Sequence, residues 1–150
     1  MELRPLTKIE YEEYLEKAIE SYGNELSTSG MVSKEKAQQT AQSTFNHILP
    51  DGFNTKDNYF YHAYDQNTLV GFIWYALQEN AAYICDFYIE EPLRKKGYGK
   101  KVMLACEEDT KKKEAKTIGL HVFGHNKAAR ALYESLNYVP TSIQMKKELY

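Results

Sequence analysis

One segment constrains this chain more than any other, namely the run RKKGYGKK at residues 94–101, in which five of the eight residues are cationic. The surrounding pattern predicts a strand before this run and a helix after it, so the two glycines lie at the turn. The first backbone N–H groups of a helix have no intrahelical acceptor, and the helix dipole is positive there. Glycine has no Cβ and therefore lets a ligand approach closely. The run predicts a phosphate-binding turn, although cationic residues alone would indicate only a solvated helix start.

The composition fits a single domain over residues 1–150. Apolar residues make up 43% of the chain, enough for a core, and a formal charge of −2 disfavours a general nucleic-acid-binding protein. Residues 1–15 are too rich in charge for a signal peptide, and no apolar run approaches the roughly 20 residues of a membrane helix. We therefore expect a cytoplasmic protein that binds neither nucleic acid nor membrane. Cys85 and Cys106 match no disulfide framework or zinc spacing.

Hydrophobic periodicity and turn residues predict a mixed α/β domain. The expected elements are a strand over 2–6, a helix that ends at a polar break over 23–30, a helix from Ser33 to Pro50, antiparallel strands over 59–64, 69–77 and 83–89, a helix over 99–113, a strand over 118–122, a helix over 127–136 and a closing strand over 143–147. Thr7 and Glu10 form the pattern of a capping box, and Ser33 is the expected N-cap of the second helix. The helix between the strands at 83–89 and 118–122 predicts a parallel crossover.

In two motifs the chain resembles the GNAT superfamily of N-acetyltransferases. Residues 94–99 match the family's Arg/Gln-x-x-Gly-x-Gly/Ala loop, which follows its fourth strand. The family's Asn-x-x-Ala-x-x-Leu-Tyr segment is matched by Asn126, Ala129, Leu132 and Tyr133. The order of the elements is also that of the family, and the stretch from Leu120 to Asn126 is similar to an uncharacterised bacterial branch.

Two positions depart from the family's pattern. Asn137 stands where the family usually has glycine before an aromatic residue, and asparagine tolerates the left-handed backbone of a helix C-terminus. Pro92 lies one residue later than is common, which affects the entrance to the loop.

The resemblance implies a GNAT-like acyl-CoA N-acyltransferase fold, with about four helices around a central, mostly antiparallel and splayed sheet. It also implies acetyl-CoA as co-substrate and no metal. In the family, the loop amides bind the pyrophosphate of coenzyme A, and the fourth strand hydrogen-bonds the pantetheine arm, which requires an open strand edge. Carried over to this chain, the residues that bind coenzyme A are Phe87, Tyr88, Ile89, Arg94, Lys95, Lys96, Gly97, Tyr98, Gly99, Lys100 and Asn126. Asn126 is equally a favoured N-cap.

The implied reaction is acetyl transfer to a primary amine by direct attack in a ternary complex. The resemblance makes Tyr133 the general acid that protonates the leaving thiolate, whereas its helical stripe alone would indicate a core residue. Asp86 is the candidate base, directly or through water, because a carboxylate in an apolar strand is unfavourable unless it is paired or functional. Its alternative role is a structural partner for a backbone amide or a lysine. Glu90 and Glu91 are competing bases, and all three acids favour a cationic amine.

Strand alternation places Ile84, Asp86 and Tyr88 on one face and Cys85 with its odd-numbered neighbours on the other. We therefore interpret Cys85 as a small core residue and not as the nucleophile of a covalent acyl-enzyme.

The main alternative function is a non-catalytic acyl-CoA-binding or sensing module on the same fold. A dinucleotide-binding oxidoreductase is disfavoured because Val102 occupies the position of the third glycine. His121 and His125 lack a third ligand in the pattern, so we expect no metal site. We interpret residues 111–113, all lysine, as a solvated helix end. The acceptor, a small-molecule or peptide amine, and the choice between monomer and homodimer are left open.

Overall fold

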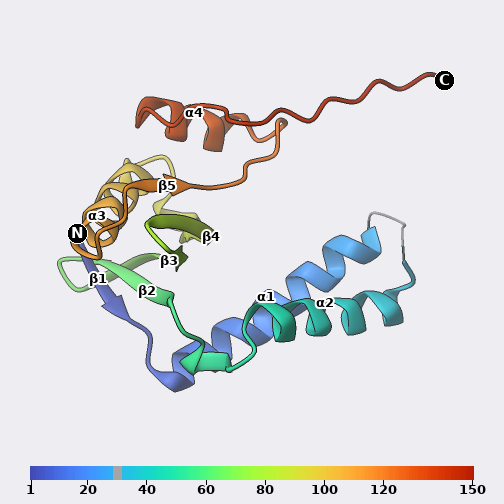
Figure 1. Ribbon diagram of the computed structural model, residues 1–150, viewed down its shortest axis with the longest axis horizontal. Helices are drawn as coiled ribbons and strands as arrows, with labels where there is room; N and C mark the ends of the chain where they lie inside the picture. The colour runs from blue at the N-terminus through green and yellow to red at the C-terminus, as the bar shows by residue number, and fades with distance from the viewer. Residues whose placement is uncertain (29–31) are drawn as a thin grey trace.

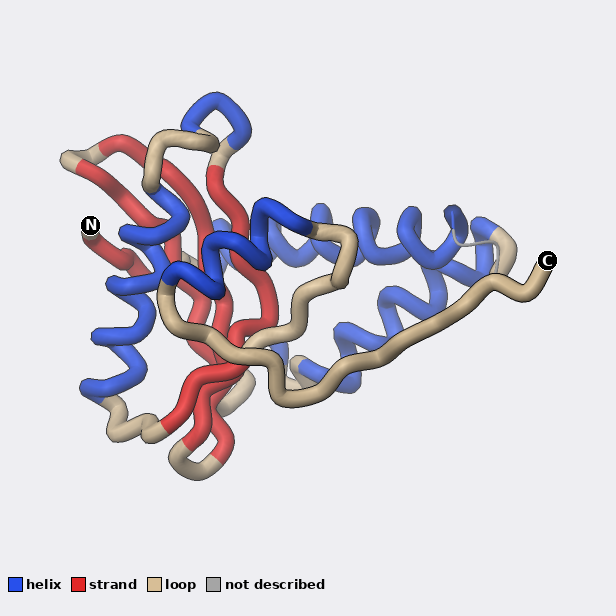
Figure 2. The backbone as a smooth tube through the Cα atoms, turned by 90° about the horizontal axis from the view of Figure 1, so that it is seen from above, coloured by secondary structure: helices blue, strands red, loops and turns tan. Residues whose placement is uncertain are grey.

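The protein, described here by a computed structural model over residues 1–28 and 32–150, has a five-stranded sheet with helices on both faces (Figures 1 and 2). The elements are β1 (Glu2–Pro5), α1 (Lys8–Thr28), α2 (Lys34–Ile48), β2 (Asn58–Asp65), β3 (Thr68–Gln78), β4 (Ala81–Ile89), α3 (Tyr98–Lys112), β5 (Thr117–Gly119) and α4 (Lys127–Ser135), with short 3₁₀ turns at Gly52–Asn54 and Glu91–Leu93. The strand order is β1-β2-β3-β4-β5; the first three pairings are antiparallel and β4–β5 is parallel. The predicted mixed α/β fold and its parallel crossover are confirmed.

Alternating side chains on β2 and β3 build one hydrophobic cluster on each face of the sheet. The cluster under α1 and α2 contains Phe60, Phe72 and Trp74 from the strands, together with Tyr11 from α1. The cluster on the opposite face packs Tyr61, Ile73 and Tyr75 with Val102, Met103 and Cys106 of α3. Burial on both faces explains why β3 reads as an almost continuous apolar run.

The predicted capping residues at the starts of the first two helices are confirmed. The Thr7 N–H donates to Glu10 Oε1 at 2.9 Å, and the Glu10 N–H donates to Thr7 Oγ1 at 3.2 Å. Ser33 accepts from the Lys36 N–H at 3.4 Å as the N-cap of α2. In the β2–β3 hairpin, residues 66 and 67 both have positive φ, of 47° and 71°, as a two-residue turn between right-twisted strands requires.

Gly23 does not break α1, which was predicted to end there and instead continues to Thr28. Gly23 is buried, and a Cβ at this position would lie 2.3 Å from Nε2 of Gln38 on α2. The glycine therefore permits close approach of the two helices. The remainder of the predicted break, residues 29 and 30, lies outside the described residues.

The predicted strand at 143–147 was wrong. Residues 139–150 contain no strand or helix, and 74% of Ile143 and 87% of Met145 are exposed. Figure 1 shows this part of the chain running away from the body of the molecule. A strand forms only where another strand accepts its hydrogen bonds, and none lies beside this segment in the part of the chain that the structure describes. The strand β5 is also shorter than predicted.

Lys113 is not the solvated helix end that its sequence suggested. Its Nζ donates to Asp109 Oδ2 at 2.7 Å, Tyr75 Oη at 2.9 Å and Tyr61 Oη at 3.2 Å. It also lies over the Tyr59 ring, 4.4 Å from the centroid. Burial alone would raise the pKa of Asp109, but hydrogen bonds from Lys113 and the two tyrosines lower it below its usual value. This half-buried network ties the end of α3 to β2 and β3.

Lys113→Met is expected to lower the free energy of unfolding by about 1–2 kcal/mol, because it leaves Asp109 without its cation. Because the pKa of Asp109 is lowered in the folded chain, the stabilisation is present at pH 7 and is lost as the pH falls below about 4. Urea unfolding at pH 7 and at acid pH measures the loss of unfolding free energy and its dependence on pH. The exposed neighbour Lys112→Met is the control, with a change within about 0.5 kcal/mol. Equal effects of the two substitutions would contradict this account.

Candidate functional site

Beyond residue 83, β4 is paired on one side only. Its ladder with β5 joins residues 81–83 to residues 117–119, and from Ile84 to Ile89 its only strand partner among the described residues is β3. The predicted splay between these two strands is therefore confirmed. It leaves a row of backbone groups at an open edge inside the protein.

The register of the β3–β4 ladder shows which amides face the open edge. The Glu90 N–H donates to the Val70 carbonyl on β3. Because donors alternate along an antiparallel ladder, the amides of Phe87 and Ile89 point to the other side. Arg94 Nε donates to the Ile89 carbonyl at 2.8 Å, so this side chain anchors the turn to the end of β4. A chain that carries amide groups of its own could add to this edge as a strand does.

A β-bulge at Cys85 sets the direction of the side chains on β4. Trp74 of β3 lies opposite Asp86, but the next residue, Tyr75, lies opposite Ile84, so Cys85 is the extra residue. The prediction that Ile84 shares the face of Asp86 was wrong, since Ile84 is buried in the cluster beside α3. Cys85 faces the same side as Asp86 and is not a core residue. The alternation predicted for residues 86–89 is confirmed.

Asp86 is held by one hydrogen bond on each oxygen. The Tyr14 hydroxyl of α1 donates to Oδ2 at 2.6 Å, and the Phe87 N–H donates to Oδ1 at 2.9 Å. Burial, and then the charge of Asp86, raises the pKa of Tyr14 above its usual value, so this hydroxyl stays protonated. Asp86 therefore does have the structural role considered as its alternative, that of a partner for a backbone amide. Tyr14 was not predicted as a site residue, because its spacing from Tyr11 and Ala18 is that of the apolar face of a helix and indicated only packing.

The turn before α3 presents a series of unpaired backbone donors. Among the described residues, the N–H groups from Lys95 to Lys100 have no acceptor; the next amide, that of Lys101, donates to the Gly97 carbonyl. Lys95 and Gly97 have positive φ, of 63° and 85°, and the segment from Arg94 to Gly97 is exposed. Donors at a positive helix end, surrounded by cationic side chains, suit a phosphate group.

The two glycines of this turn have different roles. A Cβ on Gly97 would meet nothing within 4 Å, so this glycine is required by its left-handed backbone. A Cβ on Gly99 would lie 3.2 Å from Leu132 Cδ2 of α4 and 3.8 Å from Phe87 Cζ of β4. Gly99 therefore lets the start of α3 approach both β4 and α4.

Asn126 and Tyr133 lie on α4. Asn126 caps this helix, accepting from the Ala129 N–H at 3.2 Å, so its predicted N-cap role is confirmed. Tyr133 is half-buried and its ring lies 5.8 Å from that of Tyr138. Burial, and then the negative charge of Asp86, raises the pKa of the Tyr133 phenol. Its hydroxyl has no hydrogen-bond partner within the described ranges, 1–28 and 32–150.

The turn at the end of α4 is hydrogen-bonded to the backbone of Tyr133. Asn137 has a φ of 71°, and the Tyr138 N–H donates to the Tyr133 carbonyl at 3.0 Å. This is the left-handed helix end for which asparagine was expected to replace glycine.

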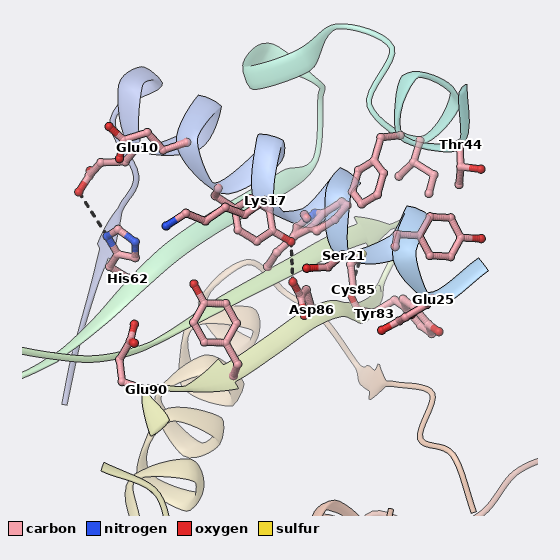
Figure 3. Close-up of a pocket in the computed structure, with 18 of the residues that line it drawn as sticks. Glu10, Lys17, Ser21, Glu25, Thr44, His62, Tyr83, Cys85, Asp86 and Glu90 are labelled. Atoms are coloured by element: carbon pink, nitrogen blue, oxygen red, sulfur yellow. Dashed lines mark hydrogen bonds and ion pairs between the residues drawn. The ribbon is translucent and has the colours of Figure 1, made fainter. Parts of the chain in front are cut away.

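A cleft of about 900 Å³ opens between the α1–α2 pair and β4 (Figure 3). Aromatic and apolar side chains line it. Its charged lining side chains are five carboxylates and one lysine. Its charged lining residues are Glu10, Glu13, Lys17, Glu25, Asp86 and Glu90. Glu10 Oε2 lies 3.3 Å from His62 Nδ1, which also lines the cleft. Of the competing bases, Glu90 lines the cleft and Glu91 does not.

Cys85 lies in the wall of the same cleft. The residue is exposed, yet its surroundings desolvate the thiol and raise its pKa to about 11, and the charge of Asp86 acts in the same direction. The thiol also lies 3.7 Å from the Tyr83 carbonyl. Because the thiolate is the attacking form, Cys85 is a poor nucleophile at neutral pH.

Across residues 1–28 and 32–150, no three histidine, cysteine or acidic side chains are grouped as metal ligands. None of the helices in those ranges combines the length and apolar character needed to cross a bilayer.

A family model described as Acetyltransferase (GNAT) family matches residues 12–138. The uncharacterized N-acetyltransferase YycN of Bacillus subtilis is 30% identical, with 98% of this chain and 97% of the relative covered. YdgE of the same organism, also an uncharacterized N-acetyltransferase, is 26% identical over the same shares.

Solved structures give the same result. The crystal structure of YycN has a TM-score of 0.86 at 30% identity and covers 99% of this chain and 98% of its own. The PaiA N-acetyltransferase of Thermoplasma acidophilum, solved with coenzyme A, has a TM-score of 0.60 at 26% identity and covers 90% of this chain and 87% of its own.

The state of the Cys85 thiol can be tested by alkylation with iodoacetamide across a pH series. A pKa of about 11, against a usual 9.0, predicts that at pH 8 the thiolate fraction is about 100-fold below that of an unperturbed thiol. Asp86→Asn should shift the alkylation profile to lower pH, because it removes a charge that opposes ionisation. Cys85→Ala provides the background from Cys106. An apparent pKa below 9 would show an activated thiol and contradict this interpretation.

Proposed function

This chain belongs to the GNAT acetyltransferase family, and we propose that it transfers an acetyl group from acetyl-CoA to a primary amine by direct attack in a ternary complex. The observation that carries the proposal is that two sets of backbone groups without a backbone partner follow each other in the chain. The open edge of β4 at Phe87 and Ile89 comes first, and the amides from Lys95 to Lys100 come next. A diphosphate followed by an amide-containing arm has the chemistry to occupy both parts.

Coenzyme A fits these two sets of groups. Its diphosphate would accept hydrogen bonds from the amides at the start of α3, with Lys95, Lys96 and Lys100 adding positive charge. Its pantetheine arm carries amides that can pair with the backbone of residues 87–89, as an added strand would. Asn126 uses its side-chain oxygen as a cap, so its amide nitrogen remains as a donor toward the arm. This placement brings the thioester to the gap between β4 and α4.

The acceptor amine would enter from the opposite face of β4, through the cleft under α1 and α2. The excess of carboxylates there favours a cation over an anion. Aromatic side chains in the wall, including Trp74 and Tyr88, add surface for the apolar part of an amine. A cationic amine is therefore the class of acceptor that this cleft best supports.

In this proposal Asp86 accepts the proton that such an amine must lose. A lysine-like amine has a pKa of about 10.4 and attacks only when neutral. Tyr14 and the Phe87 amide each occupy one site on the carboxylate, which leaves its other lone pairs for the ammonium group or a bridging water. Glu90 is the second candidate base because it lines the same cleft.

In the proposed step, the amine nitrogen bonds to the acetyl carbon and the carbon–sulfur bond breaks. The amine's surplus proton goes to Asp86, directly or through water, and Tyr133 gives a proton to the departing sulfur. Negative charge that develops on the carbonyl oxygen requires a donor already in place. The amide of Phe87 points to the open edge and is the candidate, provided that its bond to Asp86 opens when the substrates bind.

Tyr133→Phe is expected to lower turnover by about 100-fold while leaving the affinity for acetyl-CoA nearly unchanged, because only the proton donor is lost. Release of free thiol with a panel of primary amines measures turnover. Tyr138→Phe is the matched control: it removes a neighbouring hydroxyl that donates to Glu107, away from the proposed chemistry. Equal turnover in wild type and Tyr133→Phe would exclude Tyr133 as the acid. Binding of acetyl-CoA without thiol release from any amine would instead indicate a sensing module.

Gly97→Glu is expected to weaken the binding of coenzyme A by about tenfold or more, because a carboxylate would stand beside the diphosphate. Titration calorimetry measures the dissociation constant. Gly97→Asn separates charge from backbone strain, since asparagine adopts positive φ more readily than other residues and carries no charge. The asparagine variant should bind substantially more tightly than the glutamate variant. Equal affinities for the two would contradict the phosphate assignment.

A further inference from the structure

One side chain in the wall of the acidic cleft has the same chemistry as the proposed acceptor. Among the described residues that line the cleft, Lys17 of α1 is the only lysine or arginine, and its side chain ends in a primary amine. Figure 3 shows this side chain extending along the cleft between the Glu10–His62 pair and Asp86. The cleft therefore already holds an amine of the class that it is proposed to admit.

No partner holds the Lys17 amine in place. In the part of the chain that the structure describes, it makes neither an ion pair nor a hydrogen bond, although five carboxylates line the same cleft. By contrast, Glu10 lies 3.3 Å from His62, and Lys8, the other lysine of α1, lies 4.0 Å from Glu12. Because the stem of a lysine is flexible, an unpaired lysine can change its rotamer within the cleft at little cost.

The helix brings this amine within reach of Asp86. Tyr14 and Lys17 lie three residues apart on α1 and both line the cleft, so they are neighbours on one face of the helix. The Tyr14 hydroxyl donates to Asp86 Oδ2 at 2.6 Å. An extended lysine side chain is about as long as that of a tyrosine, so the Lys17 amine can reach the same depth in the cleft by a change of rotamer.

We propose, on the basis of the proposed function, that Lys17 is a site of self-acetylation within one chain. Its nitrogen bonds to the acetyl carbon, and the carbon–sulfur bond of acetyl-CoA breaks. The surplus proton of the amine goes to Asp86, directly or through water, and the sulfur takes a proton from Tyr133. The products are one acetyl-lysine and one free coenzyme A for each chain, because the modified nitrogen is an amide and does not attack again.

Acetylation of Lys17 changes the charge of the cleft. It removes the one lysine charge and leaves the five carboxylates, so the attraction of the cleft for a cation increases. It also removes an amine that competes with the acceptor for the carboxylates. The modified enzyme therefore binds a cationic acceptor more tightly than the unmodified enzyme.

Peptide mass spectrometry of the full chain after incubation with acetyl-CoA alone tests the proposal. Lys17 should be acetylated at least about tenfold faster than Lys8, which does not line the cleft and reports purely chemical acetylation. The fraction of chains modified in a given time should not depend on protein concentration, because the reaction takes place within one chain. Asp86→Asn and Tyr133→Phe should slow the acetylation of Lys17 but not that of Lys8.

Three results would overturn self-acetylation within one chain. They are equal rates at Lys17 and Lys8, a rate at Lys17 that Asp86→Asn and Tyr133→Phe both leave unchanged, and a modified fraction that rises with protein concentration. Thiol release with the panel of primary amines separates this inference from the proposed function. Turnover of an added amine while Lys17 stays unmodified overturns self-acetylation alone, whereas the absence of both thiol release and acetylated Lys17 overturns the two together.

The effect of the modification on the acceptor is measured with two substitutions at the same position. Lys17→Gln carries a neutral amide, as acetyl-lysine does, and Lys17→Arg keeps the positive charge but cannot be acetylated in the same way. For the amine of the panel that is turned over fastest, KM should be lower in Lys17→Gln than in Lys17→Arg by about threefold or more. Equal KM values for the two variants would contradict the effect on acceptor binding.

Discussion

The open edge of β4 is the constraint on which the rest of the site depends. A sheet normally satisfies its interior backbone groups with a neighbouring strand, yet β5 leaves β4 after three paired residues. The gap is kept open by what stands on either side of it. Gly99 lets α3 begin against Phe87, and Arg94 binds the Ile89 carbonyl. The result is a backbone surface that a peptide-like ligand can complete.

The bulge at Cys85 gives this edge two chemically different sides. After the bulge, Phe87 turns toward the cluster beside α3 while Asp86 turns toward the acidic cleft under α1. Acetyl-CoA bound along the edge and an acceptor amine bound in the cleft would therefore approach the same few residues from opposite faces. Tyr14 fixes Asp86 between them, because its hydroxyl stays protonated and can only donate to the carboxylate.

Local structure was predictable from the sequence wherever the residues that determine it are near neighbours in the chain. The capping box at Thr7, the glycine turn at residues 94–99 and the asparagine at the end of α4 each depend on residues within one turn. The splay of the sheet was expected only through the resemblance to a known family. The placement of coenzyme A and the roles of Asp86 and Tyr133 stay predictions.

Features set by contacts between distant segments were missed. A bulge inserts one residue without any sequence mark, so simple alternation placed Ile84 and Cys85 on the wrong faces. Gly23 read as a helix breaker because the facing residue, Gln38 on α2, is unknown until the helices pack. Tyr14 read as packing for the same reason, since its partner Asp86 is 72 positions away.

The most direct test is amide hydrogen exchange on the folded chain with and without acetyl-CoA. If acetyl-CoA adds to the open edge, the amides of Phe87 and Ile89 and those from Lys95 to Lys100 become protected together on binding. The backbone of β1 and β2 should be unaffected. Acetyl-CoA that binds, by calorimetry, while the exchange of residues 87–89 is unchanged would contradict the account, because the ligand would then lie elsewhere.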